Sequence, residues 1–310
     1  MMRGGTTFPG QSTFFRHKWV NGWYLFWLVS LPVSAMVIAE LLSVDMNSGE
    51  GVSHMIGYSV RFAIPLIFIV IAASASQRLF PGPFTTWWLR NRKYLGLCFA
   101  VAMAWQGLFI FIMSNWFRDY YYADIYLLRD EIEGSVGYVF LAVMVATSFR
   151  FGRRRLTQQQ WKFLHTSGVY FLWAYPFSVY WWNLSYYTDP QLIDHILYWA
   201  GFVAVALRIA AWGKHRMQVS GLDLNVIQAP AAINWLGIAI IIAGLVAAAT
   251  GLHWQAATTE FLTGTEWSAN LELWLPFWPF EPFLPLFAIA LGTMLATSSG
   301  RSEASPSRVV

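Results

Sequence analysis

The chain has 310 residues, of which 57% are hydrophobic and only 12% are charged, and its mean hydropathy is +0.45. Because no soluble core needs so much apolar sequence, the composition predicts an integral membrane protein. The net charge of +4 comes from short basic clusters between apolar runs, which favours membrane topology over nucleic-acid binding. The single cysteine, Cys98, excludes an internal disulfide and a thiolate metal cluster.

The apolar runs are close to the roughly 20 residues that a helix needs to cross hydrocarbon, and they do not alternate as barrel strands would. The first run is too long for a signal peptide, and the last is short and follows Pro282 and Pro285. We therefore predict an all-α, polytopic transmembrane bundle of about eight helices. Their ranges are 19–42, 55–77, 94–114, 134–151, 163–183, 193–213, 232–252 and 283–298.

The basic residues gather on one side of this predicted bundle. Apart from Arg118, Arg129 and two arginines inside helices, every lysine and arginine falls at the termini or in alternate loops. Because such residues are retained in the cytoplasm during insertion, the pattern predicts a bacterial-type inner-membrane protein with both termini cytoplasmic.

Two arginines, Arg61 and Arg208, lie inside the second and sixth apolar runs. An arginine at this depth either extends its side chain to the headgroups or faces an anionic partner or ligand. The sequence leaves both readings open.

Three local patterns occur in order in the middle of the chain. Ser53–Gly57 (SHMIG) opens the second helix, and Arg92–Leu97 (RKYLGL) opens the third. A basic loop and then Trp161–His165 (WKFLH) open the fifth, with Tyr170 and Pro176 downstream. Together these patterns resemble the ferric-reductase-like transmembrane family, most closely the haem-binding membrane subunit of the periplasmic methionine sulfoxide reductase system.

The resemblance covers roughly residues 50–216. It implies a six-helix core over residues 1–216, followed by a two-helix addition over residues 217–310.

The resemblance also implies positions for haem-ligating histidines. The family histidine of the third helix corresponds to Gln106, nine residues beyond Leu97. Of the two in the fifth helix, His165 is retained and the other corresponds to Ser178. Both helices start on the same side, so the rise per residue places Gln106 and Ser178 at about the same level. Amide and hydroxyl oxygens are poor haem ligands, so the resemblance implies that one whole haem site is lost.

The remaining histidines allow several readings. His165 either hydrogen-bonds a neighbouring helix or headgroup, or ligates a haem b with a second imidazole from His17 or His215; proton relay and metal binding are further alternatives. A weaker prediction is a shared metal site at the opposite helix ends, although no carboxylate or cysteine spacing supports it. Its ligands would be His54, His195 and His253.

The carboxy-terminal part holds an aromatic, proline-rich segment, Trp267–Phe283. Its prolines argue against a regular helix, and its aromatic residues favour either an anchor at the membrane interface or the docking of a membrane or periplasmic protein. The acidic, tyrosine-rich segment Asn115–Glu133 on the same side is expected to be a solvated loop, with a basic partner as the alternative.

The leading functional prediction is an accessory or scaffold subunit of a membrane redox complex that has lost the haem relay. This favours a role other than enzyme, with an oxidoreductase or electron-transfer subunit as the alternative. The alternative is a b-type haem electron-transfer protein that uses His165 to pass electrons from quinol or a flavoprotein to a periplasmic acceptor. A transporter or lipid-binding protein is a third reading, which rests only on Arg61, Arg208 and the helix count.

Overall fold

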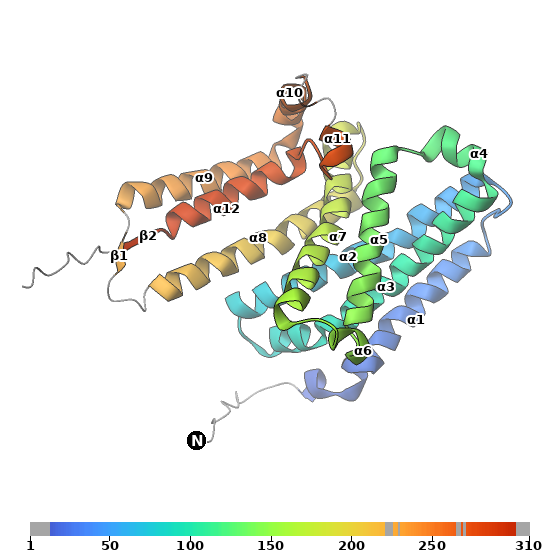
Figure 1. The fold of residues 1–310 in the computed structure, drawn as a ribbon, viewed down its shortest axis with the longest axis horizontal. Helices are drawn as coiled ribbons and strands as arrows, with labels where there is room; N and C mark the ends of the chain where they lie inside the picture. The colour runs from blue at the N-terminus through green and yellow to red at the C-terminus, as the bar shows by residue number, and fades with distance from the viewer. Residues whose placement is uncertain (1–12, 221–225, 229, 265–267, 269–270, 302–310) are drawn as a thin grey trace, which may run out of the picture. The chain divides into compact units, whose positions relative to one another are not determined.

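The computed structural model describes residues 13–220, 226–228, 230–264, 268 and 271–301. Within these residues the chain is almost entirely helical (Figure 1). Packing divides it into two compact units, Met1–Trp173 and Ala174–Val310. The division falls inside a helix, whereas the boundary at residue 216 was drawn from the family resemblance and stays a prediction.

The amino-terminal unit is organised around α3. This helix packs against α1, α2 and α5 (Figure 1), and a buried cluster of Val37, Val52, Met55, Phe109 and Met113 joins the first three helices. The elements in chain order are two 3-10 turns, Thr13–Arg16 and Lys18–Val20, then α1 Gly22–Leu41, α2 Gly49–Leu79, α3 Pro83–Trp116, α4 Arg118–Tyr120, η3 Tyr121–Ile125, α5 Leu128–Thr147, α6 Arg150–Arg153 and the first part of α7 Gln158–Tyr186.

The carboxy-terminal unit contains the rest of α7 and a group of three helices in which α12 packs against both α8 and α9 (Figure 1). A short antiparallel pair, β1 with β2, adds two strands to the predicted all-α fold. The elements are α8 Leu192–Ser220, β1 Val226–Gln228, α9 Ala231–Ala249, α10 Gly251–Thr263, α11 Leu271–Trp274, η5 Glu281–Phe283, α12 Leu284–Ala296 and β2 Ser299–Arg301.

Five of the described helices are long and apolar enough to cross a membrane: Gly22–Leu41, Gly49–Leu79, Pro83–Trp116, Leu192–Val219 and Ala231–Ala249. The helix Glu281–Ala296 is apolar but shorter. Each of the eight predicted helices has a counterpart in the structure, although α5, α7 and α12 are not among the five. The chain is thus a multi-helix membrane protein, and eight crossings remain a prediction.

Several helices extend beyond the apolar runs that predicted them. Helix α3 begins at Pro83, well before the predicted start at residue 94. Proline at the first position is pre-organised for a helix, and the Thr85 hydroxyl accepts a hydrogen bond from the Gly82 amide at 3.1 Å. Hydropathy detects only the part of a helix that sits in hydrocarbon, so the polar first turns of α3 were missed.

A buried asparagine near the start of α3 ties down the chain before α1. Asn91 is 1% exposed; its carbonyl accepts a hydrogen bond from the Gly22 amide, and its amide donates to the Asn21 side chain, both at 3.0 Å. The Trp87 indole donates to the Val20 carbonyl at 2.7 Å. These bonds satisfy the backbone at the sharp entry to α1, where Gly22 has φ +63.

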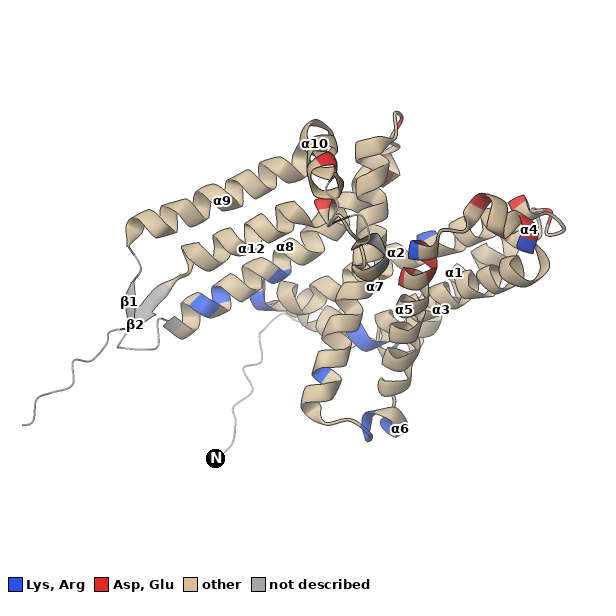
Figure 2. Ribbon diagram, turned by 45° about the horizontal axis from the view of Figure 1, so that its top comes forward, with Lys and Arg blue, Asp and Glu red and all other residues tan. Residues whose placement is uncertain are grey.

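The first turn of α5 holds acidic residues beside Arg129, whereas the charged residues that follow its last turn are all basic. Asp130 and Glu131 lie in its first turn, and the arginines of α6 follow its last turn (Figure 2). This separation fits the charge pattern that predicts the topology.

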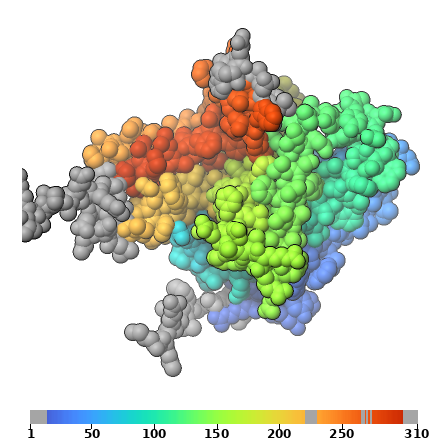
Figure 3. Space-filling model, viewed as in Figure 1, coloured from blue at the N-terminus to red at the C-terminus, as the bar shows by residue number. Residues whose placement is uncertain are grey.

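Glycines let α9 and α12 pack backbone against backbone. A Cβ added to Gly292 would lie 2.6 Å from the Gly237 carbonyl oxygen, and one added to Gly237 would lie 2.6 Å from that of Gly292. The surfaces of the two helices meet without a visible gap (Figure 3). Close approach through small residues is a general way for helices to associate in lipid, where apolar side chains gain little by leaving the hydrocarbon.

We expect Gly292→Ala to lower the thermal unfolding temperature in detergent, because the added methyl overpacks the α9–α12 contact at a cost of about 1–3 kcal/mol. Gly96→Ala is the matched control, since a Cβ at Gly96 in α3 meets nothing within 4 Å; this change should leave stability equal or slightly higher. Circular dichroism during heating measures both. Equal unfolding temperatures for the two variants would contradict the close approach.

Candidate functional site

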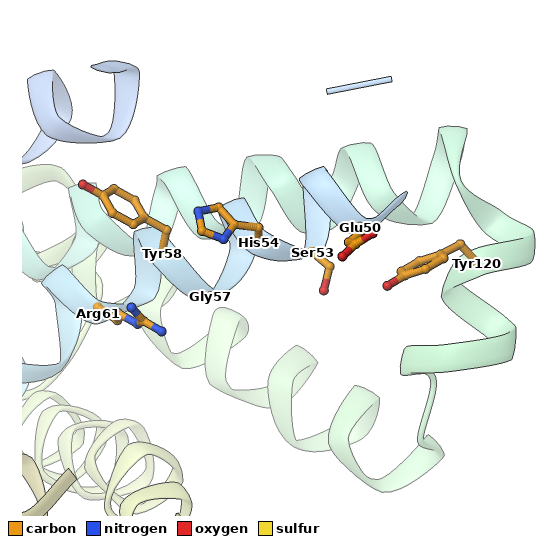
Figure 4. Close-up of a pocket in the computed structure, with 7 residues that line it drawn as sticks. All are labelled: Glu50, Ser53, His54, Gly57, Tyr58, Arg61 and Tyr120. Carbon is orange, nitrogen blue, oxygen red and sulfur yellow. The ribbon is translucent and has the colours of Figure 1, made fainter. Parts of the chain in front are cut away.

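A polar face runs along the amino-terminal half of α2. Six of its residues recur at spacings of three, one, three, one and three, so they share one side of the helix. Together with Tyr120 of α4 they line a cavity of about 290 Å³. The six residues are Glu50, Ser53, His54, Gly57, Tyr58 and Arg61 (Figure 4).

Tyr120 lies at the amino-terminal end of this cavity. In Figure 4 its hydroxyl is turned toward Ser53 and Glu50. A Cβ on Gly49 would come within 2.5 Å of the Tyr120 ring, so the absence of a side chain at residue 49 allows the ring to pack on the start of α2.

His54 has a partner at the rim of the cavity. Its Nε2 lies 2.8 Å from Oε1 of Glu40 in α1, and its ring stacks on that of Tyr58 with centroids 6.1 Å apart. His54 therefore links α1 to α2.

The other two histidines of the predicted metal site, His195 and His253, are exposed and belong to the carboxy-terminal unit. Among the described residues no three His, Cys, Asp or Glu side chains gather as metal ligands. The metal prediction gains no support.

The two intramembrane arginines differ. Arg61 is exposed on α2, and within the described part of the chain no hydrogen bond or ion pair to its guanidinium is found. Arg208 is half-buried in α8 and does have an interaction. Of the two, Arg61 is the one left to pair with something outside the described chain.

His165 is held at the start of α7 by contacts within its own unit. Its Nε2 is 3.0 Å from the Thr147 hydroxyl at the end of α5, and its ring stacks on the Trp161 indole with centroids 4.3 Å apart. The Trp161 indole donates to the Thr147 carbonyl at 3.2 Å, and its ring lies under the Arg153 guanidinium. The predicted hydrogen bond from His165 to a neighbouring helix is thus present.

Gln106 and Ser178, the two positions at which the resemblance implies a replaced ligand, also have partners. The Tyr138 hydroxyl in α5 donates to Gln106 Oε1 at 3.1 Å. Ser178 is buried and donates to the Ala174 carbonyl one turn earlier at 2.6 Å. The two residues belong to different units, so their common level stays a prediction.

These contacts do not fit a bis-imidazole haem site. Haem iron between helices takes a ring nitrogen from each side, but Gln106 and Ser178 offer oxygen atoms that already hydrogen-bond within the chain. At the third implied ligand position, the imidazole of His165 has Nε2 occupied and one face covered.

The sequence missed a buried acidic group in the carboxy-terminal unit. Glu281 is 0% exposed, and Oε1 accepts hydrogen bonds from the Thr259 hydroxyl and, at 3.5 Å, from the Tyr186 hydroxyl. Thr259 lies on α10, most of which falls outside the predicted helix ranges. A single glutamate among aromatic residues carries no periodic signal, so nothing in the sequence pointed to this cluster.

The predicted aromatic segment Trp267–Phe283 is split between surface and core. Trp274 is 78% exposed, whereas Trp278 is 7% and Phe283 8% exposed; the Phe283 ring packs on Phe177 of α7. Residues 267, 269 and 270 lie outside the described part of the chain. Much of the described segment therefore builds the core of its own unit.

In the other predicted loop, Asn115–Glu133, the Tyr121 hydroxyl donates to the Glu131 carboxylate. Desolvation and, to a smaller extent, this carboxylate raise the pKa of Tyr121. Part of the segment is helical, in α4, η3 and the start of α5, rather than loop. Its residues other than Glu133 are exposed or half-buried, as expected of a solvated segment.

We expect Thr259→Val to destabilise the carboxy-terminal unit, because the buried Glu281 carboxylate loses a donor at a cost of about 1–3 kcal/mol. Thr258→Val is the matched control: its hydroxyl donates only to the Trp254 carbonyl one turn earlier. Tryptophan fluorescence during chemical unfolding in detergent compares the two. A Thr258 variant as unstable as the Thr259 variant would contradict a special role for Glu281.

Comparisons with protein families, characterised proteins and solved structures find no match to this chain.

Proposed function

We propose that this chain is an accessory or scaffold subunit of a membrane redox assembly, derived from the ferric-reductase-like transmembrane family and lacking its haem relay. Its place is the inner membrane of a bacterial-type cell, with both termini in the cytoplasm. The observation that supports this proposal most is that Gln106, Ser178 and His165 each use a polar side-chain atom in a hydrogen bond within the chain.

These hydrogen bonds support the proposal because they give the side chains at the implied ligand positions a structural role. A polar group in a membrane helix is costly unless it is paired, and Tyr138 and Ala174 supply those pairs for Gln106 and Ser178. Replacement of the histidines thus leaves well-packed helices, which suits a subunit that contributes structure rather than electron transfer.

The test is an optical spectrum of the protein purified from cells supplied with haem precursors. We expect no Soret band and a negative pyridine haemochrome assay, because at the three implied ligand positions the only imidazole, that of His165, is hydrogen-bonded to Thr147 and stacked on Trp161. A two-haem b-type spectrum would overturn the proposal.

The second candidate is a one-haem electron carrier that uses His165, taking electrons from quinol or a flavoprotein. One observation favours it: stacking on Trp161 fixes the orientation of the imidazole near the start of α7. Ligation would require Nε2 to exchange Thr147 for iron, or Nδ1 to ligate. If purified protein carries a one-haem spectrum and His165→Ala leaves that spectrum unchanged, this second candidate fails.

The family resemblance itself has a separate test. We expect the double variant Gln106→His/Ser178→His to acquire a b-type spectrum when expressed with haem precursors, because it restores both imidazoles at the implied ligand positions. Gln106→His alone is the control and should bind haem weakly or not at all, since a single imidazole leaves one side of the iron open. If the folded double variant binds no more haem than the single variant, the assigned positions are wrong.

A further inference from the structure

The cavity on α2 ends on an arginine that has no partner in the described chain. Arg61 follows Gly49, the first residue of α2, by twelve positions, which places it about 18 Å along the helix axis. The helix is one of the five apolar enough to cross a membrane. A guanidinium at that depth needs an anion, water or a path to the headgroups.

The direction of the Arg61 side chain indicates where an anionic partner would lie. Side chains on a helix tilt toward its amino terminus, and Figure 4 shows the guanidinium turned toward Gly57. The group thus extends from the apolar half of α2 toward the polar end, where Glu50 and Tyr120 line the cavity mouth.

Gly57 leaves one position of the cavity lining without a side chain. A Cβ at this position would meet nothing within 4 Å, so no neighbour of the described chain requires glycine there. Because glycine has no side chain, open space remains between His54 and Arg61 on the exposed side of α2. The cavity volume, about 290 Å³, is near the lower limit of ligand pockets and suits a small polar headgroup rather than a whole cofactor.

We propose that this cavity binds the phosphate of a phospholipid headgroup, drawn from the leaflet at the amino-terminal end of α2, with Arg61 as its charge partner. Phosphate matches the guanidinium fork with two parallel hydrogen bonds, and lipid supplies it at the right depth. Ser53 and Tyr120 carry hydroxyls that face one another at the end of the cavity farther from Arg61 (Figure 4). The proposal requires only that the protein is in a membrane and is independent of haem.

Glu50 narrows the class of headgroup. This exposed carboxylate at the cavity mouth has no hydrogen bond or ion pair within the described residues. A negative charge there disfavours a multiply charged anion and favours a headgroup with an ammonium group beyond its phosphate. The expected ligand is therefore a phosphoethanolamine lipid.

The experiment titrates delipidated protein in neutral detergent with phosphatidylethanolamine and counts bound lipid by native mass spectrometry. We expect Arg61→Gln to weaken binding by about tenfold or more, the effect of losing a charge-assisted hydrogen-bonded pair. Arg61→Lys, which keeps the charge but not the fork, should fall between. Arg118→Gln is the matched control, because Arg118 is exposed at the same end but does not line the cavity.

A second variant keeps the test valid if Arg61→Gln does not fold. Gly57→Leu fills the cavity from an open position, so it should fold and also lose lipid binding. Maleimide labelling of Cys98, which is 2% exposed, reports folding in every variant: a folded variant should label as slowly as the parent.

Two further ligands distinguish binding of the phospholipid headgroup from binding of acyl chains and from binding of free phosphate. Diacylglycerol with the same acyl chains tests the tails, and inorganic phosphate tests the soluble anion; we expect neither to displace the phospholipid. Unchanged lipid binding in folded Arg61→Gln or Gly57→Leu would overturn the proposal. So would an equal loss in Arg118→Gln, or displacement by inorganic phosphate at concentrations comparable to the lipid.

Discussion

Hydrocarbon offers a peptide group no hydrogen-bond partner, and the structure of this chain follows from that constraint. Long helices satisfy the backbone internally, and five of them are apolar enough for the membrane. Side chains obey the same rule: Ser178 bonds to a carbonyl of its own helix, and Gln106 to Tyr138. Where helices meet in lipid, close packing through small residues holds them together in place of the hydrophobic effect. Gly237 and Gly292 allow this packing between α9 and α12.

The sequence predicted the positions of the main helices because an apolar run is itself the physical requirement for crossing a bilayer. The prediction of helix bounds from hydropathy failed where a helix continues into polar sequence. The first turns of α3 and all of α10 contain polar residues that hydropathy reads as loop, yet capping at Gly82 and packing of Gln255, which donates to the Ser185 carbonyl, keep them helical.

The candidate site was predictable only in part. Arg61, His54 and His165 stand out because charged or titratable residues are rare in apolar runs. Their partners did not stand out: Glu40, Thr147 and Trp161 come from other elements or from an earlier turn, and only the fold brings them together. Glu281 was missed because its burial depends on α10, which had not been predicted.

A polar side chain that has a hydrogen-bond partner within this chain has a structural role, whereas one without such a partner is a candidate for ligand binding. At Gln106, Ser178 and His165 the chain supplies the hydrogen bond itself, so no energetic demand remains for a ligand. At Arg61 the described chain supplies none, and the cost of a guanidinium in hydrocarbon must be met from outside. The resemblance directed attention to the implied ligand positions on α3 and α7, but the charge without a partner in the described chain lies on α2. A ligand is therefore expected at Arg61 before it is expected at any haem-ligand position that the resemblance implies.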